Sequence, residues 1–331
     1  MEEEFRFKQG QNLTVRINKG GEEIRRSYSI CSSPLEKELR IAVKRVEGGR
    51  FSMHAMSLKR GDTLEVLAPT GTFYTELNPA NRKNYLAFGA GSGITPLLSI
   101  IKTTLATEPE SRFTLLYGNR TRSSIIFREE LETLKNRYMD RFNVFHLLSR
   151  EETEAPLSAG RIDGAKCRAL TGKLIDIKNV AEFFICGPEE MIFTVKAFLE
   201  EQGVPKERIH FELFTTPGQK AGGEAVSTAE SGAIAGEELT SEVTVMIDGQ
   251  HFNFTLPYHD QSILDAALYN GADVPYSCKG GVCGTCRAKL LKGEVEMDAN
   301  YALEQDELDA GYILTCQSHP RTPVVEVDYD E

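Results

Sequence analysis

Three cysteines crowd into one short segment near the C-terminal end of this chain, and a fourth lies beyond them. Cys278, Cys283 and Cys286 have the spacing C-x4-C-x2-C, and Cys316 follows after 29 intervening residues. Thiolates from so short a segment converge on one small centre only where the backbone folds tightly around it. Glycines supply that freedom at positions Gly280, Gly281 and Gly284. The sequence therefore predicts that a metal centre governs the fold of this region.

The spacing of these cysteines is that of a plant-type 2Fe-2S cluster, with Cys278, Cys283, Cys286 and Cys316 as its ligands. Backbone N–H groups of the glycine-rich segment would face the sulfides and stabilise the reduced cluster. The alternatives are a zinc site and ordinary surface thiols. Zinc sites usually pair C-x2-C with a second such pair or with histidines at short spacing. Here the second half is one cysteine, and His319 does not stand at a matching interval.

Charge is distributed unevenly along the 331 residues. Residues 241–331 hold 16 acidic and 5 basic residues, which accounts for the whole formal net charge of −11. An acidic module repels nucleic acid and favours a protein partner with a basic docking patch. Acidity that serves only solubility is the alternative. We therefore expect no nucleic-acid partner.

The N-terminal sequence MEEEFRFKQG is acidic and lacks the apolar stretch of a signal peptide. No apolar run approaches the roughly 18 residues that a membrane helix needs. We therefore expect a cytoplasmic protein without a membrane partner. Thiols in the cytoplasm stay reduced, so the clustered cysteines indicate metal binding or catalysis, and Cys31 and Cys167, which belong to no motif, are interpreted as structural.

The chain is long enough for two or three domains, and the pattern of apolar and turn-forming residues changes twice along it. Residues 1–80 contain short strands punctuated by Gly and Pro, as in an antiparallel β-barrel. Residues 81–214 alternate apolar runs with helical patterns, which predicts an α/β domain with a parallel sheet. The expected strands of the first domain are 13–17, 26–30, 39–46 and 63–69, and those of the second are 85–89, 113–118, 142–148, 182–187 and 209–214.

Residues 215–240 contain no aromatic residue and are rich in Gly, Ala and Ser, which predicts a flexible linker. Residues 241–331 form the last predicted domain. It opens with a hairpin, 242–248 and 251–256, whose turn is Asp248-Gly249. A helix over 262–271 and the cysteine segment follow, so this domain is of the α+β class.

A glycine-rich turn follows the strand at 85–88 and opens a helix. It reads Gly89-Ala90-Gly91-Ser92-Gly93-Ile94-Thr95-Pro96, with Ile94 in place of the last glycine of G-x-G-x-x-G. The glycines allow backbone N–H groups to approach a pyrophosphate at the positive end of the helix. Thr95 suits a cap and Pro96 the first helical turn. A purely structural strand–helix turn is the alternative.

Two arginines follow the next expected strand. An acidic residue at this place would bind a ribose 2′-hydroxyl, but the sequence has Arg120 and Arg122 instead. Guanidinium groups pair with a 2′-phosphate, which favours NADPH over NADH. Ordinary surface arginines are the alternative.

Four short motifs of this chain together resemble those of the ferredoxin–NADP reductase superfamily. The stretches that carry the resemblance are 26–29 (RSYS), 49–52 (GRFS), 89–96 and 186–191 (CGPEEM). Their order, followed by a C-terminal ferredoxin segment, is that of the hybrid oxygenase reductases. The resemblance implies FAD, NADP or NAD, and 2Fe-2S as cofactors, and a β-grasp fold for the ferredoxin domain.

The resemblance also assigns roles to single residues. It implies that Arg26 neutralises the FAD pyrophosphate, that Tyr28 packs on the isoalloxazine and that Ser29 lies near its N5. It places Cys186 beside the nicotinamide C4 and Glu212 close to the flavin ring, so Ser29, Cys186 and Glu212 are the catalytic candidates; a strand-end surface carboxylate is the alternative for Glu212. The remaining cofactor-binding candidates are Gly49, Arg50, Phe51, Ser52, Gly89, Gly91, Gly93, Thr95, Pro96, Arg120, Arg122, Gly187 and Pro188.

Residues 275–320 and 127–138 resemble the reductase components of phenylacetyl-CoA epoxidase complexes. This implies an NAD(P)H-dependent reductase that passes single electrons to a diiron oxygenase within a multicomponent complex. A reductase of another hydroxylase or of a Rieske oxygenase shares the same motifs and is the alternative.

The N-terminal domain departs from the family pattern. Only 88 residues precede Gly89, and they begin at what resembles the third strand of the barrel, so two N-terminal strands are expected to be missing. An opened barrel exposes apolar edges and would hold a flavin weakly. A flavin-free, ferredoxin-type carrier is therefore a further alternative.

Overall fold

The computed structural model describes residues 5–153, 155–214, 239–258 and 260–331. Most of the predicted linker, 215–238, lies outside the described residues. The chain divides into two compact units. The first comprises Met1–Leu13, Tyr28–Lys44 and Phe73–Leu213, and the second comprises Thr14–Ser27, Arg45–Thr72 and Phe214–Glu331.

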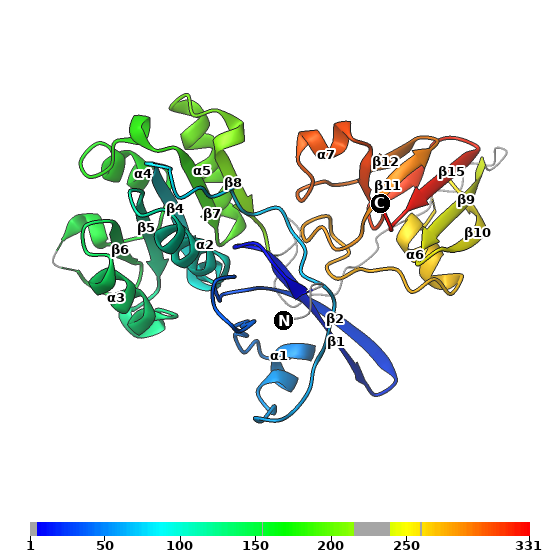
Figure 1. The fold of residues 1–331 in the computed structure, drawn as a ribbon, viewed down its shortest axis with the longest axis horizontal. Helices are drawn as coiled ribbons and strands as arrows, with labels where there is room; N and C mark the ends of the chain where they lie inside the picture. The colour runs from blue at the N-terminus through cyan, green and yellow to red at the C-terminus, as the bar shows by residue number, and fades with distance from the viewer. Residues whose placement is uncertain (1–4, 154, 215–238, 259) are drawn as a thin grey trace. The chain divides into compact units, whose positions relative to one another are not determined.

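The first unit is built on a parallel five-stranded sheet in the order β6-β5-β4-β7-β8 (Figure 1). All five strands predicted for residues 81–214 are present. Their bounds are Asn84–Ala90 (β4), Arg112–Asn119 (β5), Phe142–Leu148 (β6), Glu182–Cys186 (β7) and Ile209–Glu212 (β8). The helices between them are Ile94–Thr107 (α2), Arg128–Arg137 (α3), Gly164–Thr171 (α4) and Glu189–Glu201 (α5).

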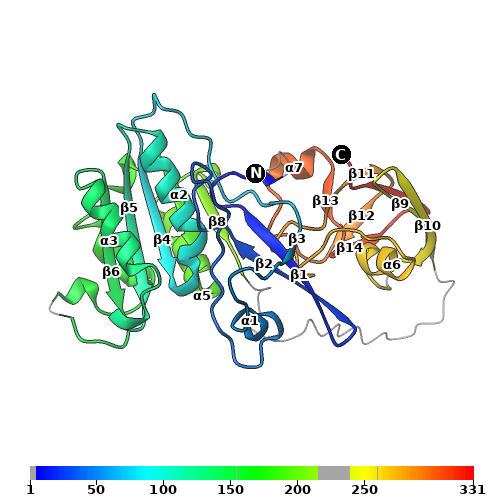
Figure 2. The ribbon, with the colours of Figure 1, turned by 60° about the horizontal axis from the view of Figure 1, so that its bottom comes forward.

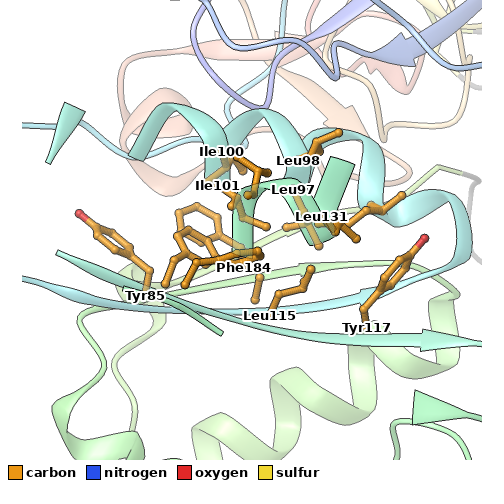
Figure 3. Packing of buried hydrophobic residues seen from close by; sticks show 14 of the residues in the cluster. Tyr85, Leu97, Leu98, Ile100, Ile101, Leu115, Tyr117, Leu131 and Phe184 are labelled. Atoms are coloured by element: carbon orange, nitrogen blue, oxygen red, sulfur yellow. The ribbon is translucent and has the colours of Figure 1, made fainter. Parts of the chain in front are cut away.

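Helices cover both faces of this sheet, which explains why β4, β5 and β7 are nearly continuous apolar runs. Alternate residues point to opposite faces. Tyr85, Leu115 and Phe184 face α2 and pack against Leu97 and Ile101, all of them nearly or fully buried (Figure 3). Burial of each such side chain stabilises the fold by about 1.5–3 kcal/mol, so α2 is firmly anchored on the sheet.

The predicted strand at 39–46 is wrong. Within these residues, Ile41 alone pairs with a neighbour, through an isolated bridge to Ile30. A strand needs a backbone partner along its length. Here the Arg40 carbonyl accepts from the Cys31 N–H at 2.8 Å, but the Arg40 N–H donates to the Ser32 hydroxyl at 3.0 Å and not to a backbone carbonyl. The segment therefore belongs to no sheet of the described structure.

The N-terminal strands form a three-stranded sheet in the order β2-β1-β3 (Figure 2). Strands β1 (Asn12–Lys19) and β2 (Glu22–Ser29) correspond to predicted strands. The last one, β3, is only Glu65–Val66, shorter than the predicted 63–69, and runs antiparallel to β1. Residues 14–27 and 45–72 of this region, with the short helix α1 (Arg50–Ala55), belong to the second unit.

The C-terminal part of the second unit is a mixed sheet in the order β10-β9-β15-β11-β13. Its strands are Thr240–Ile247 (β9), Gln250–Pro257 (β10), Arg287–Lys292 (β11), Tyr312–Leu314 (β13) and Val324–Asp328 (β15). The predicted hairpin is confirmed, because β9 and β10 pair around Asp248 and Gly249, whose φ angles are 51° and 68°. Helix α6 (Ile263–Tyr269) lies against β10, and α7 (Gln305–Asp309) lies beside β13 (Figure 2). A smaller ladder pairs β12 (Val295–Met297) with β14 (Ser318–Pro320).

Candidate cofactor sites

The carboxyl ends of three neighbouring strands bring three predicted residues into one row in the first unit. Gly89 on β4 is paired with Cys186 on β7, and Cys186 is paired with Glu212 on β8. Ligands of open α/β sheets bind outside the carboxyl ends of the strands. This edge of the sheet is therefore the candidate nucleotide site.

The glycine-rich turn lies at the same edge. A short 3-10 turn, Gly91–Gly93, connects β4 to α2. A Cβ atom on Gly93 would lie 2.0 Å from the carbonyl oxygen of Cys186, so only glycine allows the turn to pack on the end of β7. The buried Tyr117 hydroxyl donates to the Gly91 carbonyl at 2.9 Å and holds the turn from β5. The start of α2 thus presents its backbone N–H groups at the site.

The predicted cap of this helix is wrong. Helix α2 begins at Ile94, one residue before Thr95, and its N-cap is Gly93. The Thr95 hydroxyl lies inside the first turn and donates to the Ser92 carbonyl at 3.0 Å, so it does not accept from a backbone N–H as a cap would. Pro96 does stand in the first turn, as predicted.

Three residues predicted to be catalytic lie together at this edge. The Ser29 hydroxyl donates to a carboxylate oxygen of Glu212 at 2.9 Å. Cys186 is fully buried, and burial, assisted by the negative charge of Glu212, raises the pKa of its thiol well above the usual range. The thiol is consequently neutral at pH 7, which suits a packing contact and excludes a thiolate nucleophile. Gly187 and Pro188 follow, and Pro188 is the N-cap of α5.

The arginines after β5 have an acidic neighbour that the sequence analysis missed. Glu151, just beyond β6, accepts a hydrogen bond from the backbone N–H of Arg122 at 2.7 Å. Its carboxylate also lies 3.8 Å from the Arg122 guanidinium. Arg120 is exposed on the same loop. The parallel register of β5 and β6 could have signalled this, because it brings residues that follow the two strands to one edge.

The residues of the predicted flavin motifs are divided between the two units. Tyr28 and Ser29 belong to the first unit, whereas Arg26 and residues 49–52 belong to the second. Arg26 is exposed on β2, and its guanidinium donates to the backbone oxygen of Arg25 at 2.7 Å. An exposed cation on a strand is available to a diphosphate.

The second flavin motif surrounds the start of α1. Gly49 is the N-cap of this helix, and Arg50 forms an ion pair with Glu22. Phe51 and Ser52 are buried. The Ser52 hydroxyl accepts from the N–H of Val46 and donates to its carbonyl, both at 3.2 Å. In this arrangement Ser52 stabilises the preceding loop.

The four predicted cluster ligands converge in the second unit. Cys278 and Cys283 are half-buried, and Cys286 and Cys316 are buried; all seven cysteines of the chain are free thiols. Thr315, just before Cys316, donates its backbone N–H and its hydroxyl to the Cys286 carbonyl, at 3.2 and 3.0 Å. These bonds hold the distant fourth cysteine against the loop.

The thiols interact as two pairs. A hydrogen bond from Cys278 lowers the pKa of Cys283 to about 6, and one from Cys286 lowers the pKa of Cys316. The pKa of each donor, Cys278 and Cys286, is raised well above its usual range by the hydrogen bond that it makes, with burial as a further cause. Deprotonation of both members of a pair, which metal binding requires, would place two thiolates side by side, and these repel each other unless a cation neutralises them.

The arrangement of the four thiols as two pairs bears on the kind of centre they would hold. Two thiol pairs match a 2Fe-2S cluster, in which four cysteines bind two irons.

The backbone around the thiols supports the same interpretation. The Gly280 N–H donates to the Cys278 sulfur at 3.3 Å. Gly281 has φ of 73°, and a Cβ there would lie 2.8 Å from the Ala299 carbonyl oxygen. Gln317 was not singled out from the sequence. Its side-chain amide donates to the Lys279 carbonyl at 3.1 Å and lies 3.6 Å from the Cys316 sulfur.

No helix in the described part of the chain has the length and apolar character needed to cross a membrane.

Comparison with known families gives three matches along the chain. The oxidoreductase FAD-binding domain matches residues 1–74, the oxidoreductase NAD-binding domain matches residues 88–197, and the 2Fe-2S iron-sulfur cluster binding domain matches residues 245–321.

Similar proteins share this organisation. The chain is 47% identical over 331 residues to one of the subunits of 1,2-phenylacetyl-CoA epoxidase from Escherichia coli (strain K12), covering 100% of this chain and 90% of the relative. It is 33% identical to the ferredoxin reductase component of 3-ketosteroid-9-alpha-monooxygenase from Rhodococcus rhodochrous, covering 99% and 90%. Among solved structures, phthalate dioxygenase reductase is 26% identical, with a TM-score of 0.55 over 97% of this chain and 88% of that one.

Proposed function

This chain belongs to the family of oxygenase reductases that join FAD-binding, NAD-binding and 2Fe-2S domains, and we propose that it delivers electrons from NAD(P)H to the diiron oxygenase of a phenylacetyl-CoA epoxidase system. The identity of 47% over all 331 residues with the Escherichia coli epoxidase relative carries the choice of acceptor. The chain is an NAD(P)H oxidoreductase with an electron-transfer role, and the acceptor is the proposed part.

The cofactors supply the redox chemistry when they are bound: a flavin accepts a hydride from NAD(P)H and releases electrons singly, and a 2Fe-2S cluster carries one electron. The protein supplies binding and placement. We propose that Arg26, Tyr28, Ser29 and residues 49–52 hold FAD, and that the four cysteines hold the cluster. For the nicotinamide coenzyme, preferably NADPH, the proposed residues are Gly89, Gly91, Gly93, Thr95, Pro96, Arg120, Arg122, Cys186, Gly187 and Pro188.

Ser29, Cys186 and Glu212 are the proposed catalytic residues. The hydrogen bond of 2.9 Å between Ser29 and Glu212 supports a path along which a proton is exchanged at the sheet edge. The neutral, buried Cys186 thiol supports a steric role in which it packs against the coenzyme. Its bulk would also exclude water from this edge of the sheet.

We also propose domain boundaries at 1–80, 81–214 and 241–331, which enclose the three family matches. The antiparallel pairing of β1 with β3 supports an N-terminal domain of the barrel type. The mixed sheet crossed by α6 supports a β-grasp ferredoxin domain. The absence of two N-terminal barrel strands stays a prediction. The seven free thiols fit the proposed cytoplasmic location, where thiols stay reduced.

The test is reconstitution. Protein purified without oxygen is analysed for FAD, iron and sulfide, and is then mixed with NADPH or NADH, oxygen, phenylacetyl-CoA and the epoxidase oxygenase component. Coenzyme oxidation coupled to loss of phenylacetyl-CoA supports the proposal. If the protein delivers electrons to a steroid or Rieske oxygenase and none to the epoxidase, the proposed acceptor is wrong and that oxygenase takes its place. A protein that holds a cluster but no flavin, and that does not oxidise NAD(P)H with an artificial dye, is a carrier.

A further inference from the structure

Arg25, next to the proposed flavin arginine, is a buried cation in the second unit. Its side chain is 3% exposed. Its side chain contacts Glu23, Asp273, Val274 and Tyr276, which belong to the same unit, and the last three lie in the segment that leads into Cys278. Arg25 therefore connects strand β2 to the start of the cysteine loop.

Each of the three guanidinium nitrogens of Arg25 donates a hydrogen bond. Nη2 donates to an Asp273 carboxylate oxygen at 2.9 Å, and Nη1 donates to the Val274 carbonyl at 3.2 Å. Nε donates to the Glu23 carboxylate at 2.7 Å. The guanidinium plane lies over the Tyr276 ring, 4.4 Å from its centroid. A planar fork on a ring is the geometry that Arg provides and Lys does not.

Strand β1 also contacts the cysteine loop and the segment that leads into it. The Arg16 guanidinium on β1 lies 3.6 Å from the second Asp273 carboxylate oxygen. The Thr14 hydroxyl lies 3.4 Å from that of Thr285, between the second and third cysteines, and both are buried. The hairpin formed by β1 and β2 therefore contacts the cysteine loop at both of its ends.

Successive side chains of β2 point to opposite sides of the strand, so Arg25 and Arg26 face different surroundings. Arg25 points into the unit, towards the loop, whereas Arg26 is exposed. One strand thus carries a cation that holds the cysteine loop and, at the next position, the cation proposed for the FAD pyrophosphate. A buried guanidinium is tolerated only when its donors are satisfied, so loss of these partners would release the loop.

We propose that Arg25 is a positioning residue that holds residues 273–276, and with them Cys278, against the strand that carries Arg26. This inference rests on the proposed function, since it assigns to β2 the task of keeping the cluster loop beside the flavin-binding strand. The hydride from NAD(P)H would bring two electrons to a bound flavin, and each electron would then pass singly to an oxidised cluster. Only this second transfer depends on how the cysteine loop is held. Loosening the loop therefore slows cluster reduction and leaves flavin reduction unchanged.

Two variants test this role. Arg25→Lys keeps the charge and removes the fork. Asp273→Ala removes a partner of Arg25. Because the Asp273 side chain is 76% exposed, this variant should fold even if Arg25→Lys does not. The matched control is Glu326→Ala, which removes an acidic residue of the same unit whose ion pair with Lys292 involves no residue of the hairpin.

The first readout is hydrogen–deuterium exchange of the full chain, which needs no turnover. Both variants should exchange faster in residues 14–27 and 272–286, and no faster in the parallel sheet. The control should match the parent protein. Unchanged exchange in these two segments overturns the proposal, because the contacts then do not hold the loop.

The second readout is stopped-flow reduction by NADPH under anaerobic conditions, with the flavin and cluster bands followed separately. Both variants should reduce the flavin within about twofold of the parent rate and the cluster about tenfold more slowly, since small misplacements cost one to two orders of magnitude. Equal loss of both rates, or loss of neither, overturns the proposal. Failure with the epoxidase oxygenase would instead reject the proposed acceptor and leave these two readouts intact.

Discussion

The Ser29 hydroxyl donates a hydrogen bond to the Glu212 carboxylate over 2.9 Å, although 183 positions separate the two residues in the chain. Ser29 is the last residue of β2, and Glu212 ends β8, the last strand of the parallel sheet. Glu212 is also the register partner of Cys186. The bond therefore joins the N-terminal segment to the edge where the nucleotide is proposed to bind, and it places an exchangeable proton there.

Ser29→Ala should slow flavin reduction by NADPH about 10–100-fold, because the hydroxyl proposed to lie beside the flavin N5, where the hydride arrives, no longer helps to hold the two rings in register. The affinity for the coenzyme should change little, since the substitution removes no group proposed to bind it. Stopped-flow rates against NADPH concentration separate the two effects. Ser57→Ala is the matched control, because the Ser57 hydroxyl bonds only to the nearby His54 carbonyl in an exposed turn. A variant that reduces flavin at the parent rate would remove Ser29 from the mechanism.

Glu151→Gln should raise the preference for NADPH over NADH. The carboxylate lies 3.8 Å from the Arg122 guanidinium and competes with a 2′-phosphate for it. An exposed pair of this kind contributes about 0.2–1 kcal/mol, so the ratio of kcat/KM for the two coenzymes should rise by a factor between about 1.4 and 5. The adjacent, exposed Glu152→Gln is the control. An unchanged ratio would show that the 2′-position binds elsewhere.

Cys316→Ser should abolish the cluster. Cys316 is the partner of Cys286 in the second thiol pair, and a plant-type cluster needs all four thiolates. Iron and sulfide should be lost, while NADPH-dependent reduction of a dye that takes electrons from the flavin should persist. Cys167→Ser, which alters a buried thiol outside the loop, should retain the iron. Full iron content in Cys316→Ser would contradict the ligand assignment.

Gly281→Ala should lower cluster content and stability more than Gly249→Ala does. Both glycines have positive φ, 73° and 68°, so each substitution carries a backbone cost of about 1 kcal/mol. Only at position 281 would the new Cβ meet a backbone atom, the Ala299 carbonyl oxygen at 2.8 Å, whereas nothing lies within 4 Å at position 249. Iron per chain and thermal unfolding measure the difference. Equal effects would show that the loop relaxes freely.

Alkaline pH should destabilise the first unit through its buried thiols. Burial raises the pKa of Cys167 to about 12, from an ordinary value near 9. The unfolded thiol therefore loses its proton first, and the stability present below pH 9 declines as pH rises towards 12, by about 1.4 kcal/mol per pH unit. Urea unfolding at pH 8, 9 and 10 measures the slope. Cys167→Ala should make it shallower, and an identical slope would exclude this thiol as its source.

Elements whose signals are local could be predicted from the order of the amino acids alone. The apolar runs of β4 to β8 predict strands because a strand buried on both faces must be apolar along its length. The Asp248-Gly249 turn is equally local, since its two positive φ angles suit these residue types. The spacing of the four cysteines identified their common task in the same way.

Features that depend on distant neighbours emerge only in the folded chain. Residues 39–46 have a strand-like pattern, yet their pairing in the described structure is confined to an isolated bridge with Ile30 and a hydrogen bond from Cys31, and they form no sheet. Thr95 is not a cap because packing of Gly93 on the Cys186 carbonyl starts α2 one residue earlier. Glu151 meets Arg122, and Arg25 meets Asp273, through strand register and burial. The local preferences of the residues contain no information about which surfaces come into contact in the folded chain. Those contacts determine which charged groups lie next to each site.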